Sequence, residues 1–194
     1  RGSDYPDSAF TAFTEDPELT PSNTAVIQTA YLIPNGPMLG NLQGLSQSGV
    51  DIRILTNSAA STNHGSVHAY YAKYRQQLLT ANIELYEVKG TGSLAAYLDR
   101  VGEDAHAGLH TKAMVVDDRL SVIGSYNMDP RSRVWNSEIA LVVEDAGFAA
   151  SVLQEMERDF SPEAAWRLLL DEKDSLVWTG QSEGEAEQFS RDPG

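Results

Sequence analysis

The 194-residue chain is long enough for one domain with a substantial core and too short for two full domains. Its net charge of −14 repels nucleic acid and anionic membranes over the surface as a whole, so an anionic substrate has to meet a local cationic pocket. Cysteine is absent, which excludes disulfides and thiolate chemistry, and no apolar run approaches the ~20 residues needed to span a bilayer.

The two ends of the chain differ in composition from the middle. Residues 1–23 lack an initiator Met, a basic segment and an apolar segment, and we interpret them as a linker or an expression scar. Residues 181–194 are polar and have no apolar period, which predicts a disordered tail. We therefore expect one folded domain over 24–180, excised from a longer protein.

Strands and helices alternate in the first half of that domain. Residues 24–34 are rich in β-formers and end at a proline, as a buried strand does. Apolar residues at helical spacing predict a short amphipathic helix over 38–49, ended by a glycine. A second strand over 50–57 is followed by a helix over 66–81 with a serine cap, and then by a third strand over 82–88.

The second half begins with a long connection and continues with strands. Residues 89–108 show no clear period and predict a surface loop near a site. Strand-like runs cover 112–118 and 120–125, joined around Asp118-Arg119, and a further run covers 138–145.

The chain then returns to a helix and ends in a strand pair. Residues 145–160 form an amphipathic helix capped by Asp145, and 165–180 form two strands that turn around Glu172-Lys173. The strand–helix order argues for an α/β fold with a mixed, mainly parallel central sheet flanked by helices.

Two cations share one face of the strand over 112–118. Residues two apart in a strand point to the same side, so His110 and Lys112 project together, whereas Asp117 has an odd spacing from both. A histidine titrates near neutral pH and can attack phosphorus or protonate a leaving alcohol, and a lysine can hold phosphate oxygens. This pair predicts phosphodiester chemistry.

Polar residues after the next strand extend this pattern. Gly124 allows a ligand to approach the backbone, while Ser125 and Asn127 can surround phosphoryl oxygens. Glu138 opens the following strand, where its carboxylate could orient an imidazole. No step of such chemistry requires a metal or a cofactor.

These residues spell His110-x-Lys112-x4-Asp117-x6-Gly124-Ser125-x-Asn127, with Asn136-x-Glu138 downstream. The string resembles the HKD motif of the phospholipase D superfamily. Stretches such as VDIRILTNSAAS, VHAYYAKYRQQLL and GSYNMDPRSRVWNSEIALVVED are similar to the second half of the bacterial cardiolipin synthases, most like the type called C. The resemblance covers roughly residues 24–180, and the chain is identified as a carboxy-terminal HKD domain of this family.

The resemblance implies a two-step transfer through a phosphohistidine, in a site built from two facing HKD motifs. It assigns His110 to that pair, more as general acid/base than as nucleophile, and gives Glu138 the task of orienting it. It implies that Lys112, Ser125 and Asn127 hold the phosphate, with Asn136 either shaping the site or bonding within a loop. It makes Asp117 structural more than directly chemical.

The chain contains no second His-x-Lys, so the resemblance implies half of a site. The implied partners are the amino-terminal HKD domain of the same protein or a second copy, phospholipids such as phosphatidylglycerol and possibly phosphatidylethanolamine, and a bacterial membrane surface bound peripherally. Nucleic acid is not expected. The competing readings are a phospholipase D-type phosphodiesterase or nuclease active as a homodimer, and a catalytically silent domain that docks onto a partner.

Several other residues have two readings. His64 and His68 have a spacing that can hold zinc on a helix, but no third ligand is evident, and a packed helix face is favoured for His68. Arg131 could meet a second lipid phosphate or form a surface ion pair. The tryptophans could touch lipid, although packing is the default for Trp135, Trp166 and Trp178.

Overall fold

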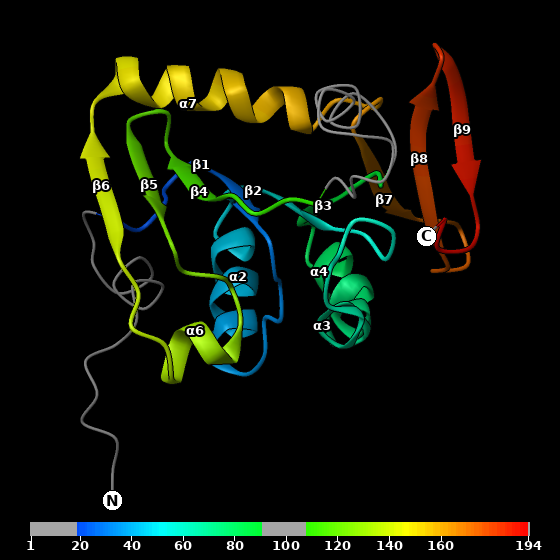
Figure 1. Ribbon diagram of the computed structural model, residues 1–194, viewed down its shortest axis with the longest axis horizontal. Helices are drawn as coiled ribbons and strands as arrows, with labels where there is room; N and C mark the ends of the chain where they lie inside the picture. The colour runs from blue at the N-terminus through cyan, green and yellow to red at the C-terminus, as the bar shows by residue number, and fades with distance from the viewer. Residues whose placement is uncertain (1–18, 91–107, 194) are drawn as a thin grey trace, which may run out of the picture.

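A mixed sheet of nine strands organises the part of the chain that the computed structural model describes, residues 19–90 and 108–193 (Figure 1). The strand order is β6-β5-β4-β1-β2-β3-β7-β8-β9. The strands are β1 (Thr24–Thr29), β2 (Asp51–Asn57), β3 (Glu84–Val88), β4 (Lys112–Val116), β5 (Leu120–Gly124), β6 (Ala140–Glu144), β7 (Ala165–Leu170), β8 (Leu176–Ser182) and β9 (Glu185–Phe189). The helices are α2 (Pro37–Gln47), α3 (Gly65–Tyr71), the 3-10 helix η1 (Ala72–Tyr74), α4 (Arg75–Thr80), α6 (Pro130–Val134) and α7 (Ala146–Asp159).

The predicted α/β class is confirmed, but the prediction of a mainly parallel sheet is wrong. Only β1–β2 and β2–β3 are parallel pairs, and the other neighbours in the sheet are antiparallel. Parallel pairing needs a helical crossover, which α2 and the α3–α4 segment provide, whereas tight turns join β4 to β5 and β7 to β8. The prediction was wrong because it extended the strand–helix alternation of the first three strands to the whole sheet.

Helices cover both faces of the sheet, so alternate residues of the central strands enter two separate cores (Figure 1). Ile54 packs on the side of α2, α3 and α4, and its neighbour Leu55 packs on the side of α7. Both side chains are fully buried. Burying a leucine or isoleucine contributes ~1.5–3 kcal/mol, which makes the central strands a rigid frame for the residues at their ends.

Several predicted boundaries change in the structure. The strand expected over 24–34 ends at Thr29, and beyond it Leu32 forms an isolated bridge with Met128. The helix expected over 66–81 begins one residue earlier and contains η1, and its N-cap position is held by His64 without a side-chain hydrogen bond, not by the serine at 66. The cap at Asp145 is confirmed, because its carboxylate accepts the backbone N–H of Phe148 at 2.7 Å.

Residues 89–108 and 181–194 were both predicted to lack regular secondary structure. Most of the loop predicted over 89–108 lies outside the described residues. The tail predicted to be disordered over 181–194 instead contains the end of β8 and all of β9. The backbone of β9 forms its hydrogen bonds with β8. The polar sequence of β9 has no apolar pattern that would predict this pairing.

A buried ionic cluster ties the helices on one face to the carboxy-terminal strands. The Glu87 carboxylate is 0% exposed and accepts hydrogen bonds from Tyr71 Oη at 2.6 Å, Arg75 Nε at 2.7 Å and Trp178 Nε1 at 3.0 Å. The Arg75 guanidinium lies 5.1 Å from the ring centroids of both Tyr71 and Trp178, and it also pairs with Asp192 at 2.7 Å. A buried charge with this many partners is tolerated only as long as the set is complete.

The substitution Glu87→Gln is therefore expected to lower the free energy of unfolding by about 3–5 kcal/mol, because Arg75 stays buried with its main counter-charge removed. Glu84→Gln on the same strand is the matched control. Glu84 pairs with Arg167 at 3.1 Å, with 41% and 47% of the two side chains exposed, so its loss should cost less than about 1 kcal/mol. Urea unfolding followed by tryptophan fluorescence measures both, and equal losses in the two variants would contradict the assignment.

Candidate active site

His110 and Lys112 lie together where β4 begins. Lys112 is the first residue of β4, and its Nζ donates a hydrogen bond to the backbone oxygen of His110 at 2.7 Å. Partial burial lowers the pKa of Lys112, and the nearby carboxylates of Glu138 and Asp129 oppose this effect only in part. His110 is exposed, so its ring is accessible from outside the chain.

Asn57, which the sequence interpretation missed, holds the backbone just before His110. Its side-chain amide donates to the carbonyl oxygens of Ala30 and Leu109, both at 2.9 Å, and its Oδ1 accepts the N–H of Leu109 at 2.8 Å. A Cβ at Gly108 would lie 2.6 Å from the backbone oxygen of Ser61, so only glycine permits this close approach. An asparagine at the end of a strand was the available signal, but its partners are far away in sequence.

The Gly124-Ser125 turn brings Glu138 into the site. A Cβ on Gly124 would lie 2.2 Å from the backbone oxygen of Ile139, so the glycine lets the two segments touch. The Ser125 hydroxyl donates to the Glu138 carboxylate and accepts the N–H of Ile139 at 3.0 Å. The same carboxylate accepts a hydrogen bond from the Asn136 side chain at 3.1 Å.

These contacts set the charge state of Glu138. Burial alone would raise its pKa, but hydrogen bonds from Ser125, Ser132 and Asn136, together with the charge of Lys112, lower it below the ordinary value. The carboxylate therefore stays ionised beside Lys112. No hydrogen bond joins it to His110 within the described residues, so the expected orienting contact is absent from this arrangement.

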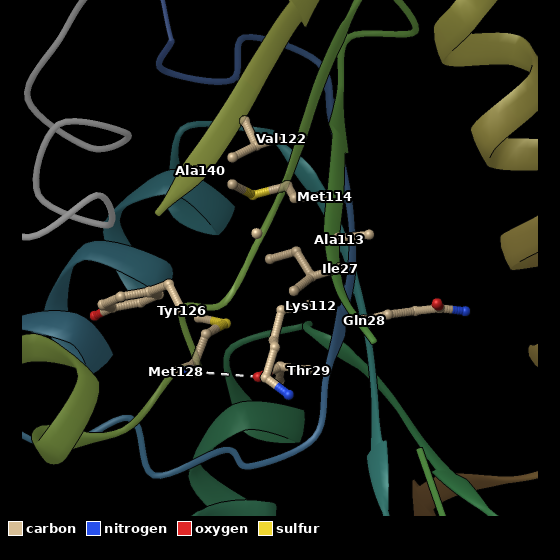
Figure 2. A pocket seen from close by; sticks show the side chains of 11 residues that line it. Ile27, Gln28, Thr29, Lys112, Ala113, Met114, Val122, Tyr126, Met128 and Ala140 are labelled. Atoms are coloured by element: carbon tan, nitrogen blue, oxygen red, sulfur yellow. Dashed lines mark hydrogen bonds between the residues drawn. The ribbon is translucent and has the colours of Figure 1, made fainter. Parts of the chain in front are cut away.

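Asn127 lies in the segment that joins β5 to α6. Its backbone N–H donates to Ser132 Oγ at 3.2 Å, while its side-chain Oδ1 is buried and has no hydrogen-bond partner within residues 19–90 and 108–193. The next residue, Met128, is anchored by Thr29 Oγ1, which accepts its N–H at 3.2 Å (Figure 2). A buried polar atom without a partner is costly, which favours a ligand group at this position.

A small apolar cavity lies under the Lys112 stem. Figure 2 shows Ile27, Met114 and Met128 around it, with Lys112 extending alongside Thr29. Its volume of about 50 Å³ is far below the ~300 Å³ of the smallest typical ligand pockets. The cavity therefore desolvates the lysine stem and does not itself bind a substrate.

Asp117 lies at the other end of β4, away from His110 and Lys112. Its carboxylate accepts the backbone N–H groups of Ser22 at 2.9 Å, Asn23 at 2.7 Å and Thr24 at 2.9 Å. Burial works against the charge, but these hydrogen bonds outweigh it and lower the pKa of Asp117. The structure thus places Asp117 as an anchor for the start of β1 and does not bring it to the other motif residues.

The other candidates separate into buried and exposed positions. Trp166 and Trp178 pack in the core, whereas Trp135 is 82% exposed at the end of α6. His68 Nε2 lies 3.1 Å from Arg75 Nη2 and 3.4 Å from Asp192, within the ionic cluster described above. Within the described residues, no group of three or more His, Asp or Glu side chains could hold a metal, and no helix is long and apolar enough to cross a membrane.

Asp117→Asn is expected to lower the free energy of unfolding by about 1.5–3 kcal/mol at neutral pH, the usual value of hydrogen bonds to a charged group. The pKa of Asp117 is lowered by folding, so its stabilisation is present above the unfolded pKa of about 3.9 and is lost as pH falls through the lower folded value. The gap between wild type and variant should therefore narrow on acidification below about pH 4. Denaturant unfolding at several pH values measures it.

Asp118→Asn is the matched control for this measurement. Asp118 is adjacent, exposed and also has a positive φ, 53° against 50° for Asp117, which asparagine tolerates. Its substitution should change stability by less than about 0.5 kcal/mol. A loss at Asp117 that did not depend on pH would contradict the role given to its ionised carboxylate.

Comparison with known proteins identifies the family to which the chain belongs. Residues 20–160 match the family described as "Cardiolipin synthase, PLD-like domain". Cardiolipin synthase C of Escherichia coli is 35% identical over 161 residues, which is 82% of this chain and 34% of that protein. Cardiolipin synthase A of Cronobacter sakazakii is 31% identical over 138 residues, which is 70% of this chain and 24% of that protein. The chain thus spans about a third or less of these relatives.

Solved structures share the fold at low sequence identity. Nuc from Salmonella typhimurium, a phospholipase D family member, superposes with a TM-score of 0.57 at 15% identity, covering 77% of this chain and 84% of Nuc. Phosphatidylserine synthase from Haemophilus influenzae gives a TM-score of 0.58 at 19% identity, covering 79% of this chain and 36% of that one.

Proposed function

Because the chain belongs to the phospholipase D-like family of the cardiolipin synthases, we propose that it is one of two HKD domains that together transfer a phosphatidyl group between phospholipids. The observation that carries this proposal is the exposed His110 beside Lys112, with the Glu138 carboxylate close to Lys112. The chain has no second His-x-Lys to complete such a site. A second HKD domain would supply it.

In the proposed first step, a histidine of the partner domain attacks phosphorus and forms a P–N bond. The P–O bond to the leaving alcohol breaks, and His110 gives its proton to that oxygen. In the second step His110 takes the proton of the incoming hydroxyl, whose oxygen attacks phosphorus as the P–N bond breaks. Atoms and charge balance, and the histidine pair returns to its starting state.

The remaining residues would stabilise and orient the transferring phosphate. Lys112 is held against the His110 backbone, so its ammonium is positioned for the phosphate oxygens before substrate arrives. The Asn127 amide would contact a second oxygen. Ser125 already donates to Glu138, so in this arrangement the serine supports the carboxylate, and the carboxylate balances the charge of Lys112.

The test adds the chain to vesicles of phosphatidylglycerol and phosphatidylethanolamine, alone and together with an amino-terminal HKD domain, and follows the lipids by mass spectrometry. Cardiolipin is expected only when both domains are present. His110→Ala should reduce its formation at least 100-fold, since general acid–base catalysis contributes ~10²–10⁴ in rate. Asp118→Asn, remote from the strand end that carries His110, serves as the control variant.

Each other outcome rejects a part of the proposal. Phosphatidic acid without cardiolipin would indicate a hydrolase, and product from the chain alone would indicate that two copies build the site. Full activity of the His110→Ala assembly would make this domain catalytically silent. Cleavage of DNA at low salt without lipid transfer would favour a nuclease, which the net charge of −14 disfavours.

A further inference from the structure

A cavity of about 440 Å³ opens beside the Asn127 turn, within the volume range of small-ligand pockets. It lies between the segment that follows β1, the start of α3, and α6. Its polar and aromatic lining includes Tyr31, His64, Tyr70, Asn127, Arg131 and Asn136. Asn127 and Asn136 also belong to the motif site, so the cavity adjoins the position proposed for the transferring phosphate.

The cavity lining carries one arginine, Arg131, and one carboxylate, Asp129, in a strongly acidic protein. Arg131 is exposed and forms no ion pair within the described residues, and Lys73 lies over the Tyr70 ring at 4.6 Å from its centroid. The one carboxylate in the lining, Asp129, is engaged by the N–H groups of Arg131 at 2.7 Å and Ser132 at 2.9 Å as the cap of α6.

Some of the lysines and arginines in the described ranges are paired with a carboxylate, and others are not. The paired cations are Arg53, Arg75, Lys89, Arg119, Arg158 and Arg167. The cations left without an ion pair in the described ranges are Lys73, Lys112, Arg131, Arg133, Lys173 and Arg191. Of these, Arg131 lines the cavity and Lys112 belongs to the motif. A protein of net charge −14 that binds anions needs cations kept free in this way.

His64 lines the same cavity as Arg131. The Tyr31 ring packs edge-on against the His64 ring, with centroids 5.5 Å apart, and the Tyr31 hydroxyl is held by donating to Asn63 Oδ1 at 2.9 Å. In the same lining, the buried Asn127 Oδ1 is an acceptor with no donor inside the described chain. The lining thus offers an anion-binding end and, next to the motif, an acceptor suited to a hydroxyl.

We propose that this cavity binds the acceptor, a glycerol alcohol that carries a phosphodiester, with Arg131 and His64 holding the phosphodiester and Asn127 Oδ1 accepting from the glycerol. The proposal rests on the proposed function. In transfer between two phospholipids the acceptor brings its own phosphate, one glycerol away from the hydroxyl that reacts. The two phosphates of the product then need two cationic subsites joined by a polar bridge. Arg131 lines the cavity together with Asn127, and Lys112 lines the small apolar cavity together with Tyr126 and Met128, the two chain neighbours of Asn127.

The kinetic test compares two acceptors in the assembled two-domain enzyme with one donor lipid held constant. Isotope-labelled dihexanoyl phosphatidylglycerol carries the second phosphate and avoids vesicle binding, whereas labelled glycerol lacks the phosphate. Arg131→Gln should raise the KM for the phosphatidylglycerol acceptor at least 10-fold relative to the KM for glycerol. This corresponds to ~1.4 kcal/mol, at the low end for a hydrogen bond to a charged group.

Arg133→Gln is the matched control, because Arg133 lies on the same short helix but outside the cavity lining. It removes the same charge and should leave both KM values within two-fold. Equal KM changes in the Arg131→Gln and Arg133→Gln variants would overturn the assignment. An equal rise of KM for both acceptors in Arg131→Gln would overturn it as well, because Arg131 would then act only through a general electrostatic effect.

A binding measurement separates failure of this subsite from failure of the proposed function. Glycerophosphoglycerol, the deacylated headgroup, is titrated into the chain in the Lys112→Met background, and the amide resonances of residues 130–134 are followed by NMR. Saturable shifts that Arg131→Gln abolishes support the subsite even if no lipid transfer occurs in any assembly. No shift, or equal binding of inorganic phosphate, would overturn recognition of the headgroup.

Discussion

The antiparallel pairing of β4 with β1 is the constraint on which the rest of the site depends. Its register places Lys112 opposite Thr29 and Val116 opposite Ala25. This pairing fixes the position of the amino-terminal end of β4, where His110 and Lys112 lie. Asp117 secures the far end through the backbone of residues 22–24, and Asn57 secures the near end through Leu109. A one-residue slip would turn every side chain of β4 to the other face. The two polar clamps and the two cores together exclude that slip.

The sequence predicts local features of this fold well and long-range ones poorly. The turns around Asp118-Arg119 and Glu172-Lys173, and the Asp145 cap, follow from residues close together in the chain, and the structure contains all three. The order of the sheet does not follow in this way, because β4 pairs with β1 although Thr29 and Lys112 are 83 positions apart in the chain. The choice of β1 as the neighbour of β4 depends on burial over both faces of the sheet. The residue pattern within a single strand does not contain this information.

The site shows the same division. The spacing predicts His110 and Lys112 on one strand face, and in the structure Lys112 Nζ reaches the backbone oxygen of His110. Asp117 lies in the turn after the far end of β4. The partners of Glu138 were not predictable, since Ser125 and Asn136 reach it through a contact of two loops that depends on the missing side chain at Gly124. The role of Asn57 was not predictable for a related reason. Its side chain bonds to backbone groups 27 and 52 residues away, and every residue carries such groups, so the sequence does not identify these partners.

The distribution of charge is compatible with the anionic substrate proposed for this strongly acidic domain. Surface carboxylates that neutralise Arg53, Arg119 and Arg158 leave the outer faces without free cations at those places. Lys112 is partly desolvated above an apolar cavity, where its field is less screened than at a free surface. An anion is therefore attracted to a few positions and repelled elsewhere. Acidic surroundings then raise the difference in electrostatic potential between Lys112 and the rest of the surface.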